Sequence, residues 1–228
     1  MSESGAEAAT VVVRGEATVE ADPEIVLFAV SVRARAKDRR EALANLAQRN
    51  EEFTAAVRSF GEAVERIETG EVTVFPELRR GRGRDERVRW YRGVLRSRLT
   101  IGDLAVVGEL VSKLSEVELC VIEGPWWRLR PGSPVYREAR VQAARAAVTR
   151  AGEYAEAVGG RLLSLLELAD TGTAAPQRLS SFQVARGASS QEPGPDETPA
   201  VIELEPETQI IQAAVEARFT MSQPATLG

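Results

Sequence analysis

Segments with a hydrophobic period of two residues alternate with segments of period 3.6 along this chain of 228 residues. The order of these predicted strands and helices limits the folds that the chain can adopt. The clearest period of two is Ile25–Ala36, where Val26, Phe28, Val30, Val32 and Ala34 fall on one face of a predicted half-buried strand. A β-branched segment, 10–20, precedes it, and Asp22-Pro23 predicts a turn between the two. We therefore expect these first two strands to form a hairpin.

Helical signals follow in three places. Asp38 and Glu41 form a capping box before a helix of about 22 residues. Its predicted inner positions are Leu43, Leu46, Asn50, Phe53, Val57 and Phe60. Asp103 can cap a shorter helix over 104–114. Ser133-Pro134 opens an alanine-rich helix over 135–158, and Gly159-Gly160 ends it.

Five further segments read as strands. Residues 64–75 and 88–101 predict a second hairpin, and 117–130 predicts an extended segment with a bulge or bend at Gly124-Pro125. Segment 162–169 is strongly apolar. The last strand has an inward face made of Ile211, Ala213, Val215, Ala217, Phe219 and Met221. The fold class is therefore α+β, with mainly antiparallel sheets, one long N-terminal helix, one short middle helix and one long alanine-rich helix.

Changes in composition along the chain predict where the domain begins and ends. We expect a disordered N-terminus at 1–9, one domain over 10–221, and a disordered tail at 222–228. The domain can consist of two lobes that meet near 102–117. Within it, 170–207 is rich in Ser, Pro, Gly and acidic residues, and we expect a long loop there.

The chain has no histidine, and Cys120 is its only cysteine. This composition removes the commonest general base, the commonest transition-metal ligand and any intrachain disulfide. No nucleophile, metal or cofactor motif stands in their place. We therefore expect no catalytic residue, no metal site and no cofactor, and an enzyme built only from carboxylates and arginines is the least supported alternative.

Charge and hydropathy narrow the class further. The formal net charge of -5 argues against nucleic-acid binding through bulk charge, although a local patch can override the average. No run of eighteen apolar residues exists, so no transmembrane segment is expected. Residues 1–7 lack the basic and apolar regions of an export signal, which favours the cytoplasm. Removal of such a signal would leave a periplasmic or secreted location open.

An ordered set of segments resembles the SIMPL domain family, whose members include oxidative-stress-associated periplasmic proteins and periplasmic immunogenic antigens. The matching segments are Val13-Arg-Gly-Glu-Ala-Thr-Val19, Asp22-Pro23, 42–50, Ile67-Glu-Thr-Gly-Glu-Val-Thr-Val74, 91–101, Ile101-Gly-Asp103, 139–160, 162–168 and Pro206. The resemblance implies a bacterial α+β protein that tends to oligomerise and has no established catalytic residues. Two features depart from the family pattern: Ala17 replaces its usual second glycine, and the usual export signal is missing.

The first candidate binding surface is rich in arginine. It comprises Arg79, Arg80, Arg82, Arg84 and Arg87, with Trp90 and Tyr91 beside them, and the pattern continues through Arg89, Arg92, Arg96 and Arg98. Guanidinium groups next to aromatic rings can bind phosphates or stack on bases, so an anion or single-stranded nucleic acid is one predicted ligand. The alternative, which we favour, is a solvated hairpin whose charges prevent edge-to-edge association.

An acidic partner for these arginines exists in the same chain. Residues 192–207 carry Glu192, Asp196, Glu197, Glu203, Glu205 and Glu207 and no basic residue. We hypothesise that this acidic loop meets the arginine-rich hairpin, within one subunit or across an oligomer interface.

A second candidate surface is the pair Trp126 and Trp127. Adjacent residues of a strand point to opposite faces, so one ring can lie in the core and the other can be exposed or at an interface. Cys120 lies among apolar residues, which favours a small buried side chain over a redox thiol.

The function that these observations favour is non-enzymatic: an oligomeric scaffold or protein-interaction module, for which the resemblance adds a stress-related role. The alternative is an anion or single-stranded nucleic-acid binding module that uses residues 79–98.

Overall fold

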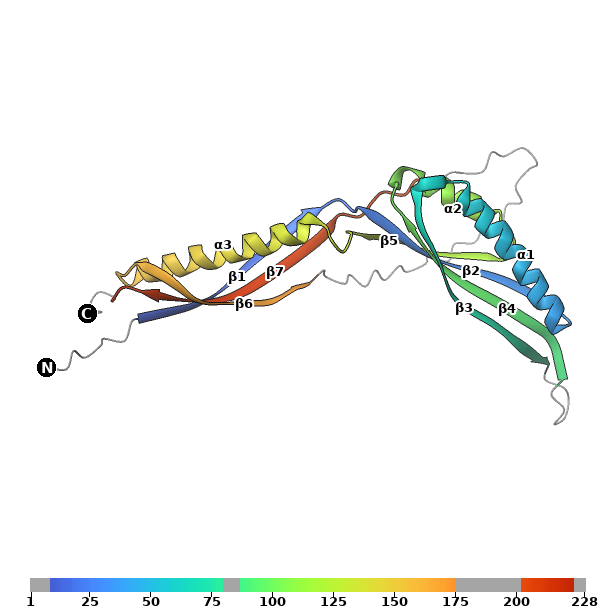
Figure 1. The fold of residues 1–228 in the computed structure, drawn as a ribbon, viewed down its shortest axis with the longest axis horizontal. Coiled ribbons are helices and arrows are strands. Elements are labelled where there is room, and N and C mark those ends of the chain that lie inside the picture. Colours follow the sequence, from blue (N-terminus) through green and yellow to red (C-terminus); the bar gives the residue numbers. More distant parts are fainter. Residues whose placement is uncertain (1–8, 80–86, 175–201, 224–228) are drawn as a thin grey trace, which may run out of the picture. The chain divides into compact units, whose positions relative to one another are not determined.

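The structure, a computed structural model, describes residues 9–79, 87–174 and 202–223 (Figure 1). These residues form seven strands and three α-helices, which confirms the α+β class. The strands are β1 (Ala9–Ala21), β2 (Ile25–Ala36), β3 (Val64–Arg79), β4 (Arg87–Ile101), β5 (Cys120–Arg128), β6 (Leu162–Ala174) and β7 (Gln209–Met221). The helices are α1 (Arg39–Arg58), α2 (Val107–Ser115) and α3 (Pro134–Ala157).

The helices begin where the sequence predicts. Asp38 Oδ1 accepts hydrogen bonds from the backbone N–H groups of Arg40 and Glu41 at the start of α1. Ser133 Oγ accepts from Val135 N–H at the start of α3, with Pro134 as its first residue. Asp103 caps a short 3-10 turn, Leu104–Val106, which leads into α2. Among these helices none is both long and apolar enough to span a membrane.

The described chain divides into two compact units. Unit 1 contains β1, α3, β6 and β7, and unit 2 contains the elements from β2 to β5 with residues 202–207. Within the described residues, the chain passes between the units after Asp22, after Leu129 and after Glu207. The predicted meeting point of two lobes near 102–117 is therefore wrong, because α2 and β5 pack on the same sheet as β2.

Unit 2 is a four-stranded antiparallel sheet in the order β3-β4-β2-β5. Its element order, βαββαβ, gives a split βαβ arrangement in which each helix connects two strands that have one other strand between them. The predicted hairpin of β3 and β4 is confirmed. Gly124-Pro125, which has a cis peptide bond, lies at an irregularity in the pairing of β5 with β2, as the sequence predicts.

Both helices of unit 2 lie on one face of this sheet (Figure 1). The core beneath them contains Phe28 from β2, Leu99 from β4, Phe53 from α1 and Leu110 from α2, all with 2% exposure or less. Leu204, from the segment before β7, packs against the same core. Leu43 of α1 is wrongly predicted to be internal, since half of its surface is exposed.

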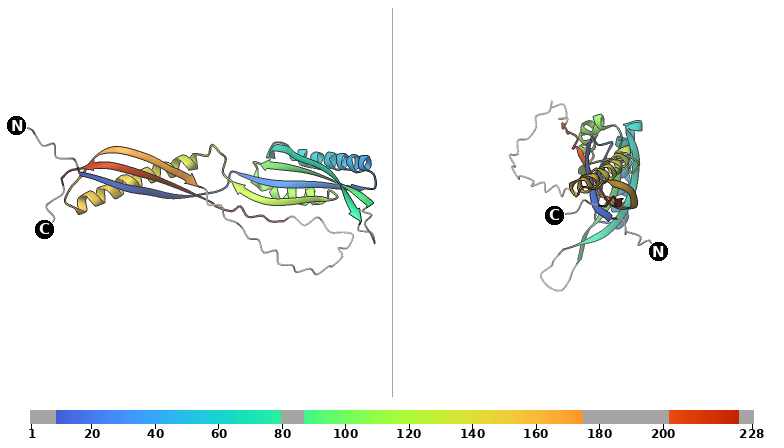
Figure 2. Two further views of the ribbon diagram at one scale, coloured as in Figure 1. Left: turned by 90° about the horizontal axis from the view of Figure 1, so that it is seen from below. Right: turned by 90° about the vertical axis from the view of Figure 1, so that its left-hand side faces the viewer.

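Unit 1 is a three-stranded antiparallel sheet in the order β1-β7-β6 (Figure 2). The predicted hairpin of β1 with β2 is therefore wrong. Strand β1 pairs instead along its whole length with β7, from Ala9 opposite Met221 to Ala21 opposite Gln209. The predicted inward face of β7, from Ile211 to Met221, is buried at every predicted position.

Helix α3 packs on this sheet through a stripe of alanines at every fourth residue: Ala139, Ala143, Ala147, Ala151 and Ala155. Their small side chains let the helix approach the backbone of β1. Gly15 lies at the closest point, where a Cβ atom would overlap the carbonyl oxygen of Ala143 and the amide nitrogen of Ala147. A glycine at position 15 is therefore required for α3 to pack this closely on β1.

Two predicted boundaries need correction at the edges of the described residues. Strand β6 continues to Ala174, so the loop expected from residue 170 begins later, and most of it lies outside the described residues. Strand β1 starts at Ala9. The segments 1–8 and 224–228 of the predicted disordered ends lie outside the described residues.

Candidate functional site

The structure divides the predicted arginine-rich hairpin. Arg79 and Arg87 pair with each other at the ends of β3 and β4, whereas Arg80, Arg82 and Arg84 lie outside the described residues. The later arginines of β4 belong to the body of the sheet. The candidate surface that the structure describes is therefore a sheet face and not a hairpin tip.

This surface, which we call the arginine face, is the side of the unit 2 sheet opposite α1 and α2. Val26, Phe28, Val30, Val32 and Ala34 point to the helices, so the alternate residues Arg33 and Arg35 of β2 point to the other side. The register places Arg92 opposite Arg35 and Arg96 opposite Ser31. The members of the arginine face are Arg33, Arg35, Arg92, Arg96 and Arg98, and all are exposed.

Carboxylates of the edge strand β3 hold three of these arginines. Glu77 bridges two of them, with 2.6 Å between its Oε2 and Arg35 Nη2 and a second ion pair from its Oε1 to Arg92. Glu71 lies 3.2 Å from Arg96 Nη1. In the part of the chain that the structure describes, the side chains of Arg33 and Arg98 form no ion pair.

The aromatic candidates lie on both sides of this sheet. Trp90 shares the arginine face, where the Arg35 guanidinium lies 5.0 Å and the Lys37 ammonium 5.8 Å from its ring centre. Tyr91 pairs with Ala36 and points to the helix side. Trp127 is 5% exposed and belongs to the core, whereas Trp126 is 39% exposed on the arginine face, as predicted for adjacent tryptophans.

A second surface, which the sequence does not single out as a site, lies on β6. We call it the leucine strand and define it by Leu162, Leu163, Leu165, Leu166 and Leu168. The last four are each more than half exposed, including Leu165 at 52% and Leu168 at 51%. Such a concentration of exposed leucines on one edge strand is typical of an interaction surface.

Irregularities in the pairing of β6 with β7 set the direction of these leucines. Leu162, Leu165 and Leu168 are three residues apart, a spacing that would alternate between faces in a regular strand. Register shifts after Leu162 and after Leu165 place them opposite Met221, Phe219 and Ala217 of β7, all of which face α3. The three leucines therefore share the helix side of the sheet.

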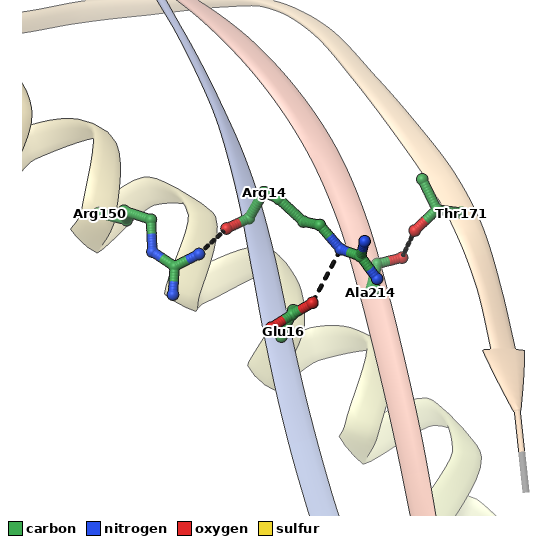
Figure 3. Close-up of polar contacts among 5 residues, drawn as sticks. All are labelled: Arg14, Glu16, Arg150, Thr171 and Ala214. Carbon is green, nitrogen blue, oxygen red and sulfur yellow. Dashed lines mark hydrogen bonds and ion pairs between the residues drawn. The ribbon is translucent and has the colours of Figure 1, made fainter. Parts of the chain in front are cut away.

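Helix α3 covers β1 and β7 and leaves this part of β6 open. Arg150 of α3 donates to the carbonyl oxygen of Arg14 on β1, which shows which flank of the helix faces that strand (Figure 3). Val148, two residues earlier, points roughly the opposite way and is half exposed. A Cβ atom on Gly152, one helical turn further on, would meet nothing within 4 Å. Val148 and Gly152 therefore mark a flank of α3 that the described residues leave uncovered.

The other edge of the same sheet is protected. Strand β1 presents Arg14 and Glu16, which pair at 2.8 Å, and Arg150 satisfies one of its carbonyl groups (Figure 3). Charged side chains of this kind discourage a further strand from adding to an edge. On β6, the Thr171 hydroxyl donates to the carbonyl oxygen of Ala214 on β7 (Figure 3). This bond stabilises the side of β6 that already pairs with β7.

Cys120 lies on the helix side of the unit 2 sheet, opposite Val32, and therefore on neither surface. Burial raises the pKa of the Cys120 thiol to about 11, so the thiol stays protonated and weakly nucleophilic at neutral pH. The described residues contain no cluster of three or more metal-ligating side chains. A depression of about 450 Å³ at the start of α3 is lined by Pro131, Tyr136, Arg137 and Arg140 among others, and it holds neither a carboxylate nor a thiol.

The predicted contact between the acidic loop and the arginine-rich hairpin stays a prediction. Glu192, Asp196 and Glu197 lie outside the described residues, and Glu203 and Glu205 are exposed. The sequence analysis did not include Arg33 and Arg35 in the arginine-rich surface because it paired β2 with β1. The pairing of β2 with β4 would have joined them to Arg92 and Arg96.

Comparison with protein families finds one match: residues 11–219 fit the model described as SIMPL, a protein of unknown function (DUF541). No curated protein matches the chain. The match covers both units, so it includes the leucine strand and the arginine face.

Proposed function

Because the chain belongs to the SIMPL family, a family of unknown function, we propose its role from its surfaces: a non-enzymatic interaction module that assembles with copies of itself through the leucine strand. The observation that carries this proposal is the exposure of four leucines on one edge strand. Burying the exposed part of each is worth on the order of 1 kcal/mol, enough together to favour association.

A second copy of the chain is the partner that fits best. The leucine strand is apolar and carries only Glu167 as a charged residue between Leu162 and Ala169, and that carboxylate lies 3.8 Å from Arg218 of its own sheet. A partner of opposite charge therefore has little to bind. An identical apolar surface is complementary to it, and symmetric contacts of this kind are the commonest way in which proteins form oligomers.

Light scattering with paired variants tests the proposal. The wild-type protein is expected to have a mass above that of the 24.7 kDa chain at micromolar concentration. Replacing Leu165 and Leu168 by glutamate should return it to a single chain, because two charges would be buried in the interface. Leu43→Glu on α1 is the matched control, since Leu43 is 51% exposed, the same as Leu168. A wild-type mass of one chain over the whole concentration range would contradict the proposal.

The non-enzymatic part of the proposal is supported by the composition of the whole chain, which has no histidine and a single cysteine. The raised pKa of Cys120 makes a thiolate nucleophile unfavourable at neutral pH. A cytoplasmic location and a stress-related role stay predictions.

A second candidate function is the binding of an anion or a single-stranded nucleic acid. The observation that favours it is the arginine face, where five exposed guanidinium groups lie on the two central strands of one sheet. Binding of a short oligonucleotide, measured by fluorescence anisotropy at low and high salt, tests this function. Absence of binding at low salt would contradict it.

A further inference from the structure

We propose that the arginine face is itself the binding surface and that its ligand is a single-stranded nucleic acid whose bases stack on the aromatic rings of the same face. The inference rests on the second candidate function. It differs from the sequence prediction in location, because it uses the bodies of β2 and β4 and does not involve the tip between β3 and β4.

The spacing of the arginines suits an extended polyanion. Strands β2 and β4 are neighbours, about 4.8 Å apart, and alternate residues along a strand lie about 6.8 Å apart on one face. Arg33 and Arg35 on β2 therefore run beside Arg92, Arg96 and Arg98 on β4 in two adjacent rows. A guanidinium group can bind a phosphate with two hydrogen bonds, and a row of such groups can follow a phosphate backbone.

The acidic residues near the arginine face leave its two rows of arginines accessible to a ligand. The carboxylates that pair with it, Glu71 and Glu77, lie on the edge strand β3 and not between the two rows. Arg33 and Arg98 form no ion pair with any described residue, and Glu68, which lies opposite Arg98 on β3, pairs with Arg66 instead, so the two arginines are the first contacts for a phosphate. The ion pair of Arg96 with Glu71 is exposed on both sides and is weak enough for a phosphate to displace the glutamate.

The aromatic rings distinguish a nucleic acid from an acidic protein. Trp90 on β4, Phe75 on β3 and Trp126 on β5 belong to the arginine face, and the last two are each 39% exposed. Exposed rings beside a cationic track are the feature on which successive bases stack. An acidic peptide would use the arginines and leave these rings without a partner. By analogy of architecture alone, four-stranded sheets with both helices behind them bind single-stranded RNA through rings on the open face.

Titration of the full chain with a fluorescein-labelled twenty-nucleotide (dT) strand and with poly(U) tests the inference. All three tryptophans lie in unit 2 and two of them on the arginine face, so binding should also quench tryptophan emission. The double variant Arg33→Gln, Arg98→Gln should weaken binding roughly tenfold at low salt and reduce the slope against log salt by about 1.4, or 0.7 per lost contact. Arg137→Gln, Arg140→Gln on α3 is the control with the same loss of charge.

The outcomes separate the inference from the function on which it rests. Binding with quenching, weakened by the face variant and unchanged in the control, supports the inference. Equal weakening in both double variants, or none in either, would overturn the location while the binding function stands. Poly-L-glutamate binding as tightly as the oligonucleotide would overturn the nucleic-acid assignment. No binding of any of these polymers at low salt would overturn both the inference and the second candidate function.

Discussion

The two units of this protein pack a helix against a sheet in opposite ways. In unit 2, large side chains such as Phe28, Leu46 and Phe53 fill the space between the sheet and α1, and α2 covers the rest of the same face. In unit 1, α3 meets the sheet through alanines and the backbone of Gly15, so it lies close but covers little width. Among the described residues, the leucine strand includes the part of the helix-side face that α3 leaves uncovered.

This difference separates the proposed roles of the units. Unit 2 buries a core of large side chains beneath its two helices and exposes a charged face with aromatic rings, which suits a ligand. Unit 1 leaves more apolar surface on β6 than its single helix can cover, which suits another copy of the chain. Under the proposal, unit 2 is complete in a single chain and unit 1 is completed by assembly with a second copy.

The largest expected effect is on the core of unit 2. Phe53→Ala removes a ring that is fully buried against β2 and β4, and it should lower the free energy of unfolding of unit 2 by about 3–5 kcal/mol. Tryptophan emission follows this unit during urea unfolding, because Trp90, Trp126 and Trp127 all belong to it. Leu43→Ala on the same helix should change stability by less than about 0.5 kcal/mol. Equal losses in the two variants would contradict the described core.

The second-largest expected effect is a loss of stability in unit 1, caused by adding a methyl group at the closest contact between β1 and α3. Gly15→Ala places a methyl group against the backbone of α3, which cannot move without lifting the helix, so we expect a loss of about 1–3 kcal/mol. Hydrogen exchange of the α3 amides should accelerate while the tryptophan transition of unit 2 stays in place. Gly132→Ala is the control, since a Cβ atom there meets nothing within 4 Å. Unchanged exchange in the Gly15 variant would disprove the close contact.

The smallest expected effect concerns the pH dependence of unit 2. Burial raises the pKa of Cys120, so the folded state holds the thiol proton more tightly than the unfolded state does. The stability that this contributes is present below the ordinary thiol pKa of 9.0 and is lost as the pH rises to about 11. The urea midpoint of unit 2 should therefore fall less between pH about 8 and about 10.5 in Cys120→Ala than in the wild type. An identical fall in both proteins is the contrary result.

Local signals in the sequence predict the elements well, and long-range pairing is where they fail. The cap at Asp38, the proline at the start of α3 and the inward face of β7 depend on residues that are neighbours in the chain, and the structure confirms all three. The partner of β1 is β7, and no residue near Asp22-Pro23 encodes that choice. A turn at this point is compatible with a hairpin and equally with a passage from one unit to the other.

The candidate sites show the same difference between local signals, which the sequence contains, and long-range pairing, which it does not reveal. The arginines of β4 are evident in the sequence, but the face that they form depends on which strands lie beside β4. The leucines of β6 are evident too, yet an apolar strand normally predicts a buried one. Their exposure follows from the width of α3 and from the register shifts of β6, neither of which a period of two or of 3.6 residues reveals.

Hydrogen exchange at two protein concentrations tests the central claim most directly. If unit 1 assembles through the leucine strand, raising the concentration should slow exchange of the β6 amides around Leu165 and Leu168. The amides of β1, whose edge is charged, and those of β2 and β4 behind the arginine face should exchange at the same rate at both concentrations. Protection that rises on β1 or on the arginine face, with β6 unchanged, would contradict the account.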